Sequence, residues 1–151
     1  MREYRPKSAA EIARNMAAIR STANLTETAL RKAIHRKGFR YRKNVSGVPG
    51  RPDLVFPREK VAVFVDGDYW HGRLLRERGL EALESTLRTP TRGYWLAKFQ
   101  RNVARDDYVT GILKRQGWIV LRFWESDIKR DVLPAARRVA QAVRRRRRKL
   151  S

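Results

Sequence analysis

Six side chains in this sequence have the types and positions that hydrolysis of a phosphodiester would require. They are five acids and one histidine: Glu27, Asp53, Asp66, Asp68, Asp106 and His71. Such hydrolysis needs charge neutralisation at the phosphate and an activated water. One or two Mg²⁺ ions held by carboxylates supply both when a general base lies nearby. The sequence has no cysteine, no G-x-S-x-G serine, no P-loop and no G-x-G-x-x-G motif, so nothing supports covalent nucleophilic catalysis or a nucleotide-binding loop.

The stretch PGRPDLVFPREKVAVFVDGDYWHG carries four of these six residues. Two apolar runs, Leu54–Phe56 and Val61–Val65, are joined by the turn 57–60 and predict a β-hairpin. Asp53 stands at the start of the first strand, and the second strand runs directly into Asp66. Because hard divalent cations prefer oxygen ligands, carboxylates at the ends of buried strands indicate a metal site at this edge of the sheet.

Helices are predicted before this stretch. Residues 1–10 are basic and polar and are expected to form a flexible arm. A short helix is predicted over Ser8–Arg20, where serine can cap and a glutamate follows three residues later. A second helix is predicted from Asn24 or Thr26 to Lys37, with a glycine directly after it.

Two of the acids fall on apolar helix faces. Glu27 lies on the core-facing side of the second helix, although a capping-box glutamate is the alternative interpretation. Asp106 lies between Val103 and Val109 on the apolar stripe of a long helix predicted over Tyr94–Gln116. A carboxylate on an apolar face is costly unless it is paired or bound to a metal, so Asp106 is either a site residue or a salt-bridged aspartate.

The remaining segments complete a mixed α/β domain. We expect a strand over Phe39–Val45, a helix over Arg73–Leu87, and a near-continuous apolar strand, central to the sheet, over Trp118–Trp124. A last helix opens at residues 131–134, and the run Arg144–Lys149 is typical of a solvated, disordered tail. The order predicts a single domain with a central sheet of about four strands flanked by helices.

The amino-acid composition indicates which class of partner the protein binds. The formal net charge is +21 and the isoelectric point is about 11.5, which indicates nucleic acid as the usual partner. An acidic membrane surface is the rival, but no amphipathic apolar segment accompanies the basic residues. No run of about 18 apolar residues and no signal-like N-terminus are present, so we expect a bacterial cytoplasmic, nucleoid-associated protein with no membrane partner.

Four ordered blocks carry a resemblance to a known family. PGRPD, VAVFVDGDYWHG, YWLAKFQRNVARD and GWIVLRFWE, with RNMAAI upstream, resemble the very-short-patch-repair (Vsr) family of DNA mismatch endonucleases over Ile12 to Glu125. The resemblance implies a restriction-endonuclease-like three-layer fold. It also implies an enzyme that nicks double-stranded DNA 5′ to the T of a T:G mismatch, using Mg²⁺.

The resemblance also implies roles for the acids and the histidine. Asp53 matches a metal-binding aspartate, and Val65 stands where a backbone carbonyl completes the metal site. Asp66 matches a position next to that site. His71 matches the proposed general base, and Asp106 matches the aspartate that pairs with it.

Further residues match positions outside the metal site. Glu27 matches an acid that is reached through water. Tyr69, Trp70 and Trp95 match aromatic residues that wedge into the duplex beside the mismatch, where a mispaired base step unstacks most easily. The alternative is that these aromatics belong to the core. Arg51, in the PGRPD block, is expected to contact DNA.

The sequence departs from the family at its structural zinc. The family commonly carries cysteines directly after V-D-G and after W-E, where this chain has Asp68 and Ser126. We therefore expect no structural zinc, and expect Arg73–Leu87 to hold this region by packing. The segment from 71 to 95 also looks longer than in the family's repair enzymes, and the arginine-rich end is unusual.

Three other functions stay open from the residues alone. A homing or restriction-like endonuclease would use the same catalytic core on a different target, because groove contacts decide base preference. A DNA-binding protein without catalysis would predict loss of the acids, which are all present. A ribonuclease differs by recognition of the 2′-OH, to which no residue can be assigned. We expect a monomer, with repair-pathway proteins as candidate partners.

Overall fold

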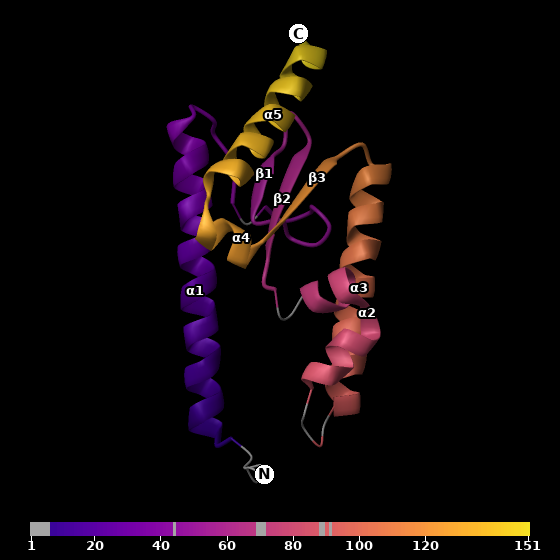
Figure 1. Cartoon of the computed structure of the whole chain (residues 1–151). Coiled ribbons are helices and arrows are strands. Elements are labelled where there is room, and N and C mark those ends of the chain that lie inside the picture. The colour runs from indigo at the N-terminus through magenta and orange to yellow at the C-terminus, as the bar shows by residue number, and fades with distance from the viewer. Residues whose placement is uncertain (1–6, 44, 69–71, 88–89, 91) are drawn as a thin grey trace.

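The computed structural model describes residues 7–43, 45–68, 72–87, 90 and 92–151. Within them, helices flank a three-stranded sheet (Figure 1), which confirms the mixed α/β class. In chain order the elements are α1 (Ala9–Arg36), β1 (Leu54–Phe56), β2 (Val61–Asp66), α2 (Arg73–Thr86), α3 (Arg92–Arg115), β3 (Ile119–Trp124), α4 (Glu125–Arg130) and α5 (Leu133–Leu150).

The sheet has the order β1-β2-β3. β1 and β2 form the predicted antiparallel hairpin, with Leu54 opposite Val63, and β3 runs parallel to β2. The expectation that β3 is central was wrong, because β2 holds that place. The apolar run of β3 is explained by helices on both faces of an edge strand: Leu121 packs with the α1 and α5 side, and Val120 packs with the α3 side.

The strand expected over Phe39–Val45 is not formed in the described residues of that segment. Only Arg42 makes an isolated bridge, to Val55, through two backbone hydrogen bonds of 2.9 Å. β1 is three residues long and offers too short an edge for a fourth strand, so Phe39 is buried by packing while the alternating arginine and lysine side chains stay exposed.

Three layers surround the site. One core cluster joins α1, α4 and α5 to one face of the sheet, and a second joins α3 to the other face. Figure 1 shows α5 crossing the sheet on the side opposite α3, with α2 lying against α3. Leu83, Leu87 and Phe99 form a third cluster between α2 and α3. The predicted three-layer architecture is therefore confirmed with three strands.

α1 is one continuous helix of 28 residues, not the two helices expected. Ser8 caps it: its Oγ accepts from the backbone N–H of Glu11 at 3.2 Å, and its own N–H donates to the Glu11 carboxylate at 2.8 Å. The segment 21–24, where a break was expected, holds residues of modest helix propensity but no glycine or proline, and these do not suffice to end a helix. Asn24 and Thr26, expected to start a second helix, lie inside this one.

The arginine-rich end continues α5 to Leu150 instead of forming a disordered tail. Arginine is a good helix former, and several of these side chains have partners. The guanidinium groups of Arg144 and Arg147 lie 5.1 Å from the centre of the Phe39 ring, and Arg146 donates to the Gly117 carbonyl at 2.8 Å. Within the described residues, no helix is long and apolar enough to span a bilayer.

Candidate active site

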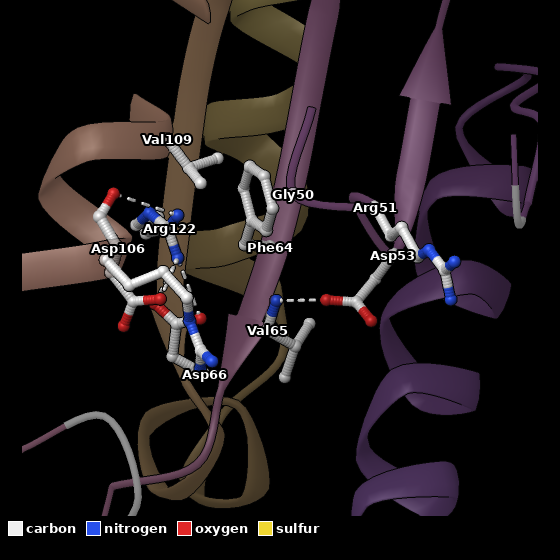
Figure 2. A pocket seen from close by; sticks show the side chains of 10 residues that line it. Gly50, Arg51, Asp53, Phe64, Val65, Asp66, Asp106, Val109 and Arg122 are labelled. Atoms are coloured by element: carbon white, nitrogen blue, oxygen red, sulfur yellow. Dashed lines mark hydrogen bonds and ion pairs between the residues drawn. The ribbon is translucent and has the colours of Figure 1, made fainter. Parts of the chain in front are cut away.

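A pocket of about 280 Å³ lies where β2 ends. Three of the predicted acids line it, and they come from different elements: Asp53 precedes β1, Asp66 ends β2, and Asp106 lies on α3. Figure 2 shows Asp53 beside Val65 on one side of β2 and Asp66 grouped with Asp106 on the other. The lining residues are Gly50, Arg51, Asp53, Phe64, Val65, Asp66, Arg105, Asp106, Val109 and Arg122.

The hairpin register places Asp53. Leu54 pairs with Val63, so the residue before β1 lies beside the last residues of β2. There the carboxylate Oδ2 of Asp53 accepts a hydrogen bond of 2.7 Å from the backbone N–H of Val65. The two residues that the resemblance assigned to the metal are therefore in direct contact.

The loop that leads to Asp53 passes tightly against α3. Gly50 has a φ of +78°, and a Cβ built on it would lie 2.4 Å from the Val109 Cγ1 atom. Arg51 also has a positive φ, of 50°, and its side chain is exposed at the pocket. Because no real side chain tolerates a 2.4 Å contact, glycine is required for this close approach. The P-G-R-P-D block thus sets the position of the carboxylate through its backbone.

Asp66 is buried with an arginine that the sequence did not single out. Both carboxylate oxygens accept from Arg122 Nη1, at 3.0 and 3.1 Å, and only 6% of Asp66 is exposed. The Arg122 guanidinium also donates from Nε to Thr110 at 2.9 Å and lies 4.0 Å from the centre of the Phe64 ring. The signal for this residue was one arginine inside the apolar run WIVLRFW.

Asp106 shares the same arginine. One Asp106 carboxylate oxygen lies 3.9 Å from Arg122 Nη1, and the Asp106 backbone carbonyl accepts a hydrogen bond from Nη2 at 3.4 Å. Only 7% of Asp106 is exposed. The prediction that the apolar stripe of α3 buries this carboxylate is confirmed. One guanidinium thus serves two buried carboxylates, an arrangement that depends on every partner being present. His71, the expected partner of Asp106, lies outside the described residues.

Glu27 and Trp95 do not line this pocket. Glu27 lies inside α1, half-buried, and pairs with Arg31 at 3.2 Å, so the capping-box interpretation was wrong. Trp95 is half-buried between α2 and α3, with its ring 6.2 Å from that of Phe99 and Lys98 Nζ 5.3 Å from its centre. Tyr69 and Trp70 lie outside the described residues.

The charge of the pocket is balanced. Three carboxylates face three guanidinium groups, of which Arg51 and Arg105 are exposed. Sequence reasoning also missed Arg105, because one arginine in a chain this basic carries no signal. Among the described residues, no group of three or more histidine, aspartate or glutamate side chains is arranged to hold a metal by itself. A metal ion in this pocket would be held by the Asp53 carboxylate, a backbone oxygen and water.

Comparison with known proteins places this site in a family. The family model described as DNA mismatch endonuclease Vsr matches residues 7–77. A type II nicking enzyme of Neisseria meningitidis serogroup C is 45% identical over 125 residues, which cover 83% of this chain and 80% of the relative. The chain belongs to the Vsr family of DNA endonucleases. The residues matched by the family model span α1, β1, β2 and the start of α2, and they include Asp53, Val65 and Asp66 of the pocket.

Two further relatives match over most of this chain. A type II nicking enzyme of Lentzea aerocolonigenes is 40% identical over 127 residues, which cover 81% of this chain and 72% of the relative. The DNA mismatch endonuclease Vsr of Escherichia coli K12 is 28% identical over 116 residues, which cover 77% and 70%. The predictions of a Vsr-family chain and of a DNA endonuclease are thus confirmed.

Proposed function

We propose that this endonuclease nicks one strand of double-stranded DNA 5′ to the T of a T:G mismatch, with Mg²⁺ as its metal. The observation that carries the proposal is the pocket at the end of β2, where three carboxylates from three elements meet two exposed arginines. The relatives' names support it, since they describe nicking enzymes and a mismatch endonuclease.

The donor set suits one hard cation. In this proposal the Asp53 carboxylate and the Val65 carbonyl hold Mg²⁺, and water fills the remaining positions, as is usual for this ion. A bound Mg²⁺ supplies charge neutralisation at the phosphate and lowers the pKa of its water. The hydrogen bond from the Val65 N–H to Asp53 Oδ2 supports this proposal, because it holds the carboxylate at the residue whose carbonyl would be the second ligand.

The surrounding residues divide the remaining tasks. Arg51 and Arg105, exposed at the pocket, hold the scissile phosphate by charge-assisted hydrogen bonds. His71 takes the proton of the attacking water, and Asp106 orients it. Asp66 and Arg122 fix Asp106 in place.

In this proposal, aromatic side chains recognise the mismatch. Tyr69, Trp70 and Trp95 wedge between base steps, which costs least at a mispair and gives selectivity without reading each base. Glu27, which lies outside the pocket, acts through water. The partner is double-stranded DNA, and the enzyme acts as a monomer.

The test is a nicking assay on a labelled duplex with one T:G mispair, beside its T:A control, with and without Mg²⁺. Asp53→Asn removes the charge but keeps an oxygen that can accept from the Val65 N–H. Asp107→Asn, at an exposed carboxylate next to Asp106, is the matched control. We expect nicking of T:G alone, lost without Mg²⁺ and in Asp53→Asn but kept in Asp107→Asn.

Each other result has a definite meaning. Equal cutting of both duplexes keeps the nuclease and discards mismatch selectivity. Cleavage of both strands at one sequence favours the homing or restriction-like alternative. Tight binding without cutting of any duplex overturns the enzyme mechanism proposed for this pocket.

A further inference from the structure

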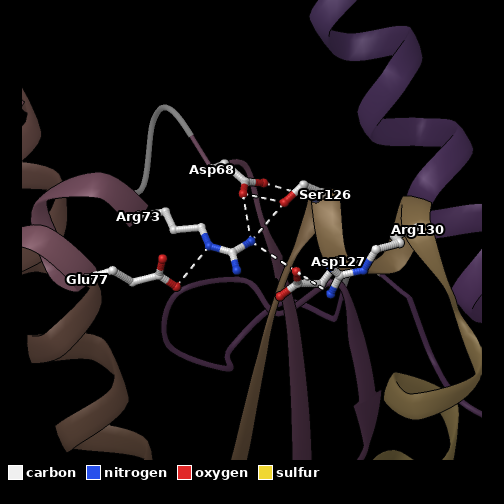
Figure 3. A network of polar contacts seen from close by, with 6 residues as sticks. All are labelled: Asp68, Arg73, Glu77, Ser126, Asp127 and Arg130. Atoms are coloured by element: carbon white, nitrogen blue, oxygen red, sulfur yellow. Dashed lines mark hydrogen bonds and ion pairs between the residues drawn. The ribbon is translucent and has the colours of Figure 1, made fainter. Parts of the chain in front are cut away.

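A second polar cluster lies beyond the end of β2, centred on the guanidinium of Arg73. Figure 3 shows carboxylates and a hydroxyl converging on it from separate segments. Its Nη1 lies 3.0 Å from Asp68 Oδ2, 2.8 Å from Ser126 Oγ and 3.1 Å from Asp127 Oδ1, and its Nε donates to Glu77 at 2.9 Å. The guanidinium also lies 5.5 Å from the centre of the Trp124 ring.

Asp68 is held by further bonds that favour its charged form. The Ser126 N–H donates to Oδ1 at 3.0 Å, and the Ser126 hydroxyl donates to Oδ2. Partial burial opposes the charge, but the bonds from Ser126 and Arg73 outweigh it and hold the pKa of Asp68 below its ordinary value. The Asp68 carboxylate that faces Arg73 is therefore ionised at neutral pH.

The cluster joins three segments that the sequence separates. Asp68 follows β2, Arg73 is the first residue of α2, and Ser126 and Asp127 lie at the start of α4, directly after β3. The backbone N–H of Arg73 also donates to the Asp68 carbonyl at 3.0 Å. These contacts hold Asp68, which lies two residues after the pocket residue Asp66, against the starts of α2 and α4.

The structural zinc that the family resemblance implies does not fit this place. Zinc in structural sites prefers cysteine and histidine ligands in a tetrahedron, and the chain has no cysteine. Asp68 and Ser126 stand at the family's two cysteine positions, and one guanidinium contacts both side chains. That positive charge opposes a cation at the same point. The expected replacement by packing of α2 is also incomplete, because ion pairs hold the start of this helix.

We propose that Arg73 is the metal-free structural centre of this region and a positioning residue for nicking. Its guanidinium links Asp68, directly beyond β2, and the start of α2 to α4, and thereby fixes the end of β2, where Val65 and Asp66 line the pocket. The positioning role rests on the proposed function; the metal-free cross-link does not. A planar guanidinium can meet four acceptors spread around it, whereas a lysine ammonium reaches fewer of them, so Arg73→Lys keeps the charge but only part of the geometry.

The test compares Arg73→Ala and Arg73→Lys with Arg78→Ala, a control at an exposed arginine of the same helix. Thermal unfolding is followed by circular dichroism in EDTA and in Zn²⁺, and single-turnover and steady-state nicking are measured at a temperature where each variant is folded. We expect the wild-type midpoint to be the same in EDTA and in Zn²⁺. We expect Arg73→Ala to lower kcat by about ten- to a hundredfold with KM little changed, because a misplacement of about 1 Å can cost on the order of 10²-fold.

Rescue by Arg73→Lys and non-additive effects of paired variants distinguish a positioning role of Arg73 from general destabilisation of the protein. Arg73→Lys should recover part of kcat, and Arg78→Ala should match wild type. Should Arg73→Ala fail to fold, Asp127→Asn and Arg73→Lys, alone and combined, supply the test: their effects on kcat should be non-additive. Wild-type kcat in folded Arg73→Ala, or additive effects in that cycle, overturns the positioning role.

Two further outcomes keep the two proposals apart. A wild-type midpoint that falls in EDTA and recovers with Zn²⁺ overturns the metal-free centre. If the wild-type protein nicks no duplex, the proposed function and the positioning role are both overturned. The unfolding midpoints of the Arg73 variants still test whether Arg73 is a structural cross-link.

Discussion

Arg122 is the residue whose removal should disturb the site most. Its single positive charge serves two carboxylates that are nearly inaccessible to water, and its guanidinium lies over the Phe64 ring. Removing one partner of a buried ion pair leaves the other charge uncompensated, and this costs more than the pair contributes when intact. Arg122 therefore links the stability of the fold to the geometry of the candidate site.

We expect Arg122→Met to lower the free energy of unfolding by about 3 to 5 kcal/mol, because Asp66 and Asp106 lose their shared cation. Arg122→Lys should cost less, since it keeps the charge. Equilibrium unfolding in urea measures both variants. Combining Arg122→Met with Asp66→Asn should recover part of the loss, and a single Arg122→Met within 1 kcal/mol of wild type would contradict the buried cluster.

Gly50 permits a second residue-scale prediction with a close control. Gly50→Ala places a methyl group where the Val109 side chain already lies, and should lower the free energy of unfolding by about 1 to 3 kcal/mol. It should also reduce nicking, because the loop carrying Asp53 must move. Gly47→Ala has a similar φ, +87°, but no atom within 4 Å of the new Cβ, and isolates the backbone strain. Equal effects of both changes on unfolding and nicking would show that the contact with Val109 does not matter.

Sequence reasoning reached the acids of the pocket but not their neutralising partner. The burial of Asp106 followed from its spacing on α3, and the positions of Asp53 and Asp66 followed from a hairpin that depends on local pattern alone. Arg122 was not found because its partners lie 56 and 16 residues away in the chain. Only the parallel pairing of β2 with β3 brings these groups together, and periodicity does not encode that pairing.

At the scale of elements, the unexpected helix is the end of α5. Its arginines looked like a solvated run, yet Arg147 reaches back to the turn of the hairpin and pairs with Glu59 at 3.1 Å. Glu59 is 8% exposed, so its charge needs this partner. Local sequence could not reveal a contact across 88 residues. α5 therefore supports the hairpin that carries Asp53 and Asp66.

We expect Arg147→Ala to lower the free energy of unfolding by about 1 to 2 kcal/mol, because Glu59 keeps a buried carboxylate without its partner. This expected loss in the free energy of unfolding is small for a buried carboxylate, because half of the Arg147 side chain is exposed and solvent screens the ion pair. Arg145→Ala, at an exposed position of the same helix, should be neutral. Thermal unfolding of both variants checks this, and equal midpoints would mean that the end of α5 contributes nothing to the fold.

At the scale of the whole molecule, the net charge is +21 and basic residues occur on both α3 and α5, but of these two helices only α3 lines the candidate active site. α5 covers the opposite face of the sheet (Figure 1). We expect a duplex bound at the pocket to contact Arg51 and Arg105, which line it and are exposed. The salt dependence of binding should distinguish the two faces, because each phosphate contact releases counterions and steepens the dependence of affinity on salt by about 0.9 in a log–log plot.

We expect Arg51→Gln combined with Arg105→Gln to weaken binding of T:G and T:A duplexes alike and to lower the magnitude of that slope by about 2, one unit per lost phosphate contact. Arg137→Gln combined with Arg145→Gln removes the same charge from the exposed side of α5 and should leave the slope unchanged. Fluorescence anisotropy over a range of NaCl concentrations, with the Asp53→Asn background to prevent cutting, measures both pairs. An equal fall in slope for the α5 pair would mean that the duplex also contacts the far face, and would displace the pocket as the centre of the DNA interface.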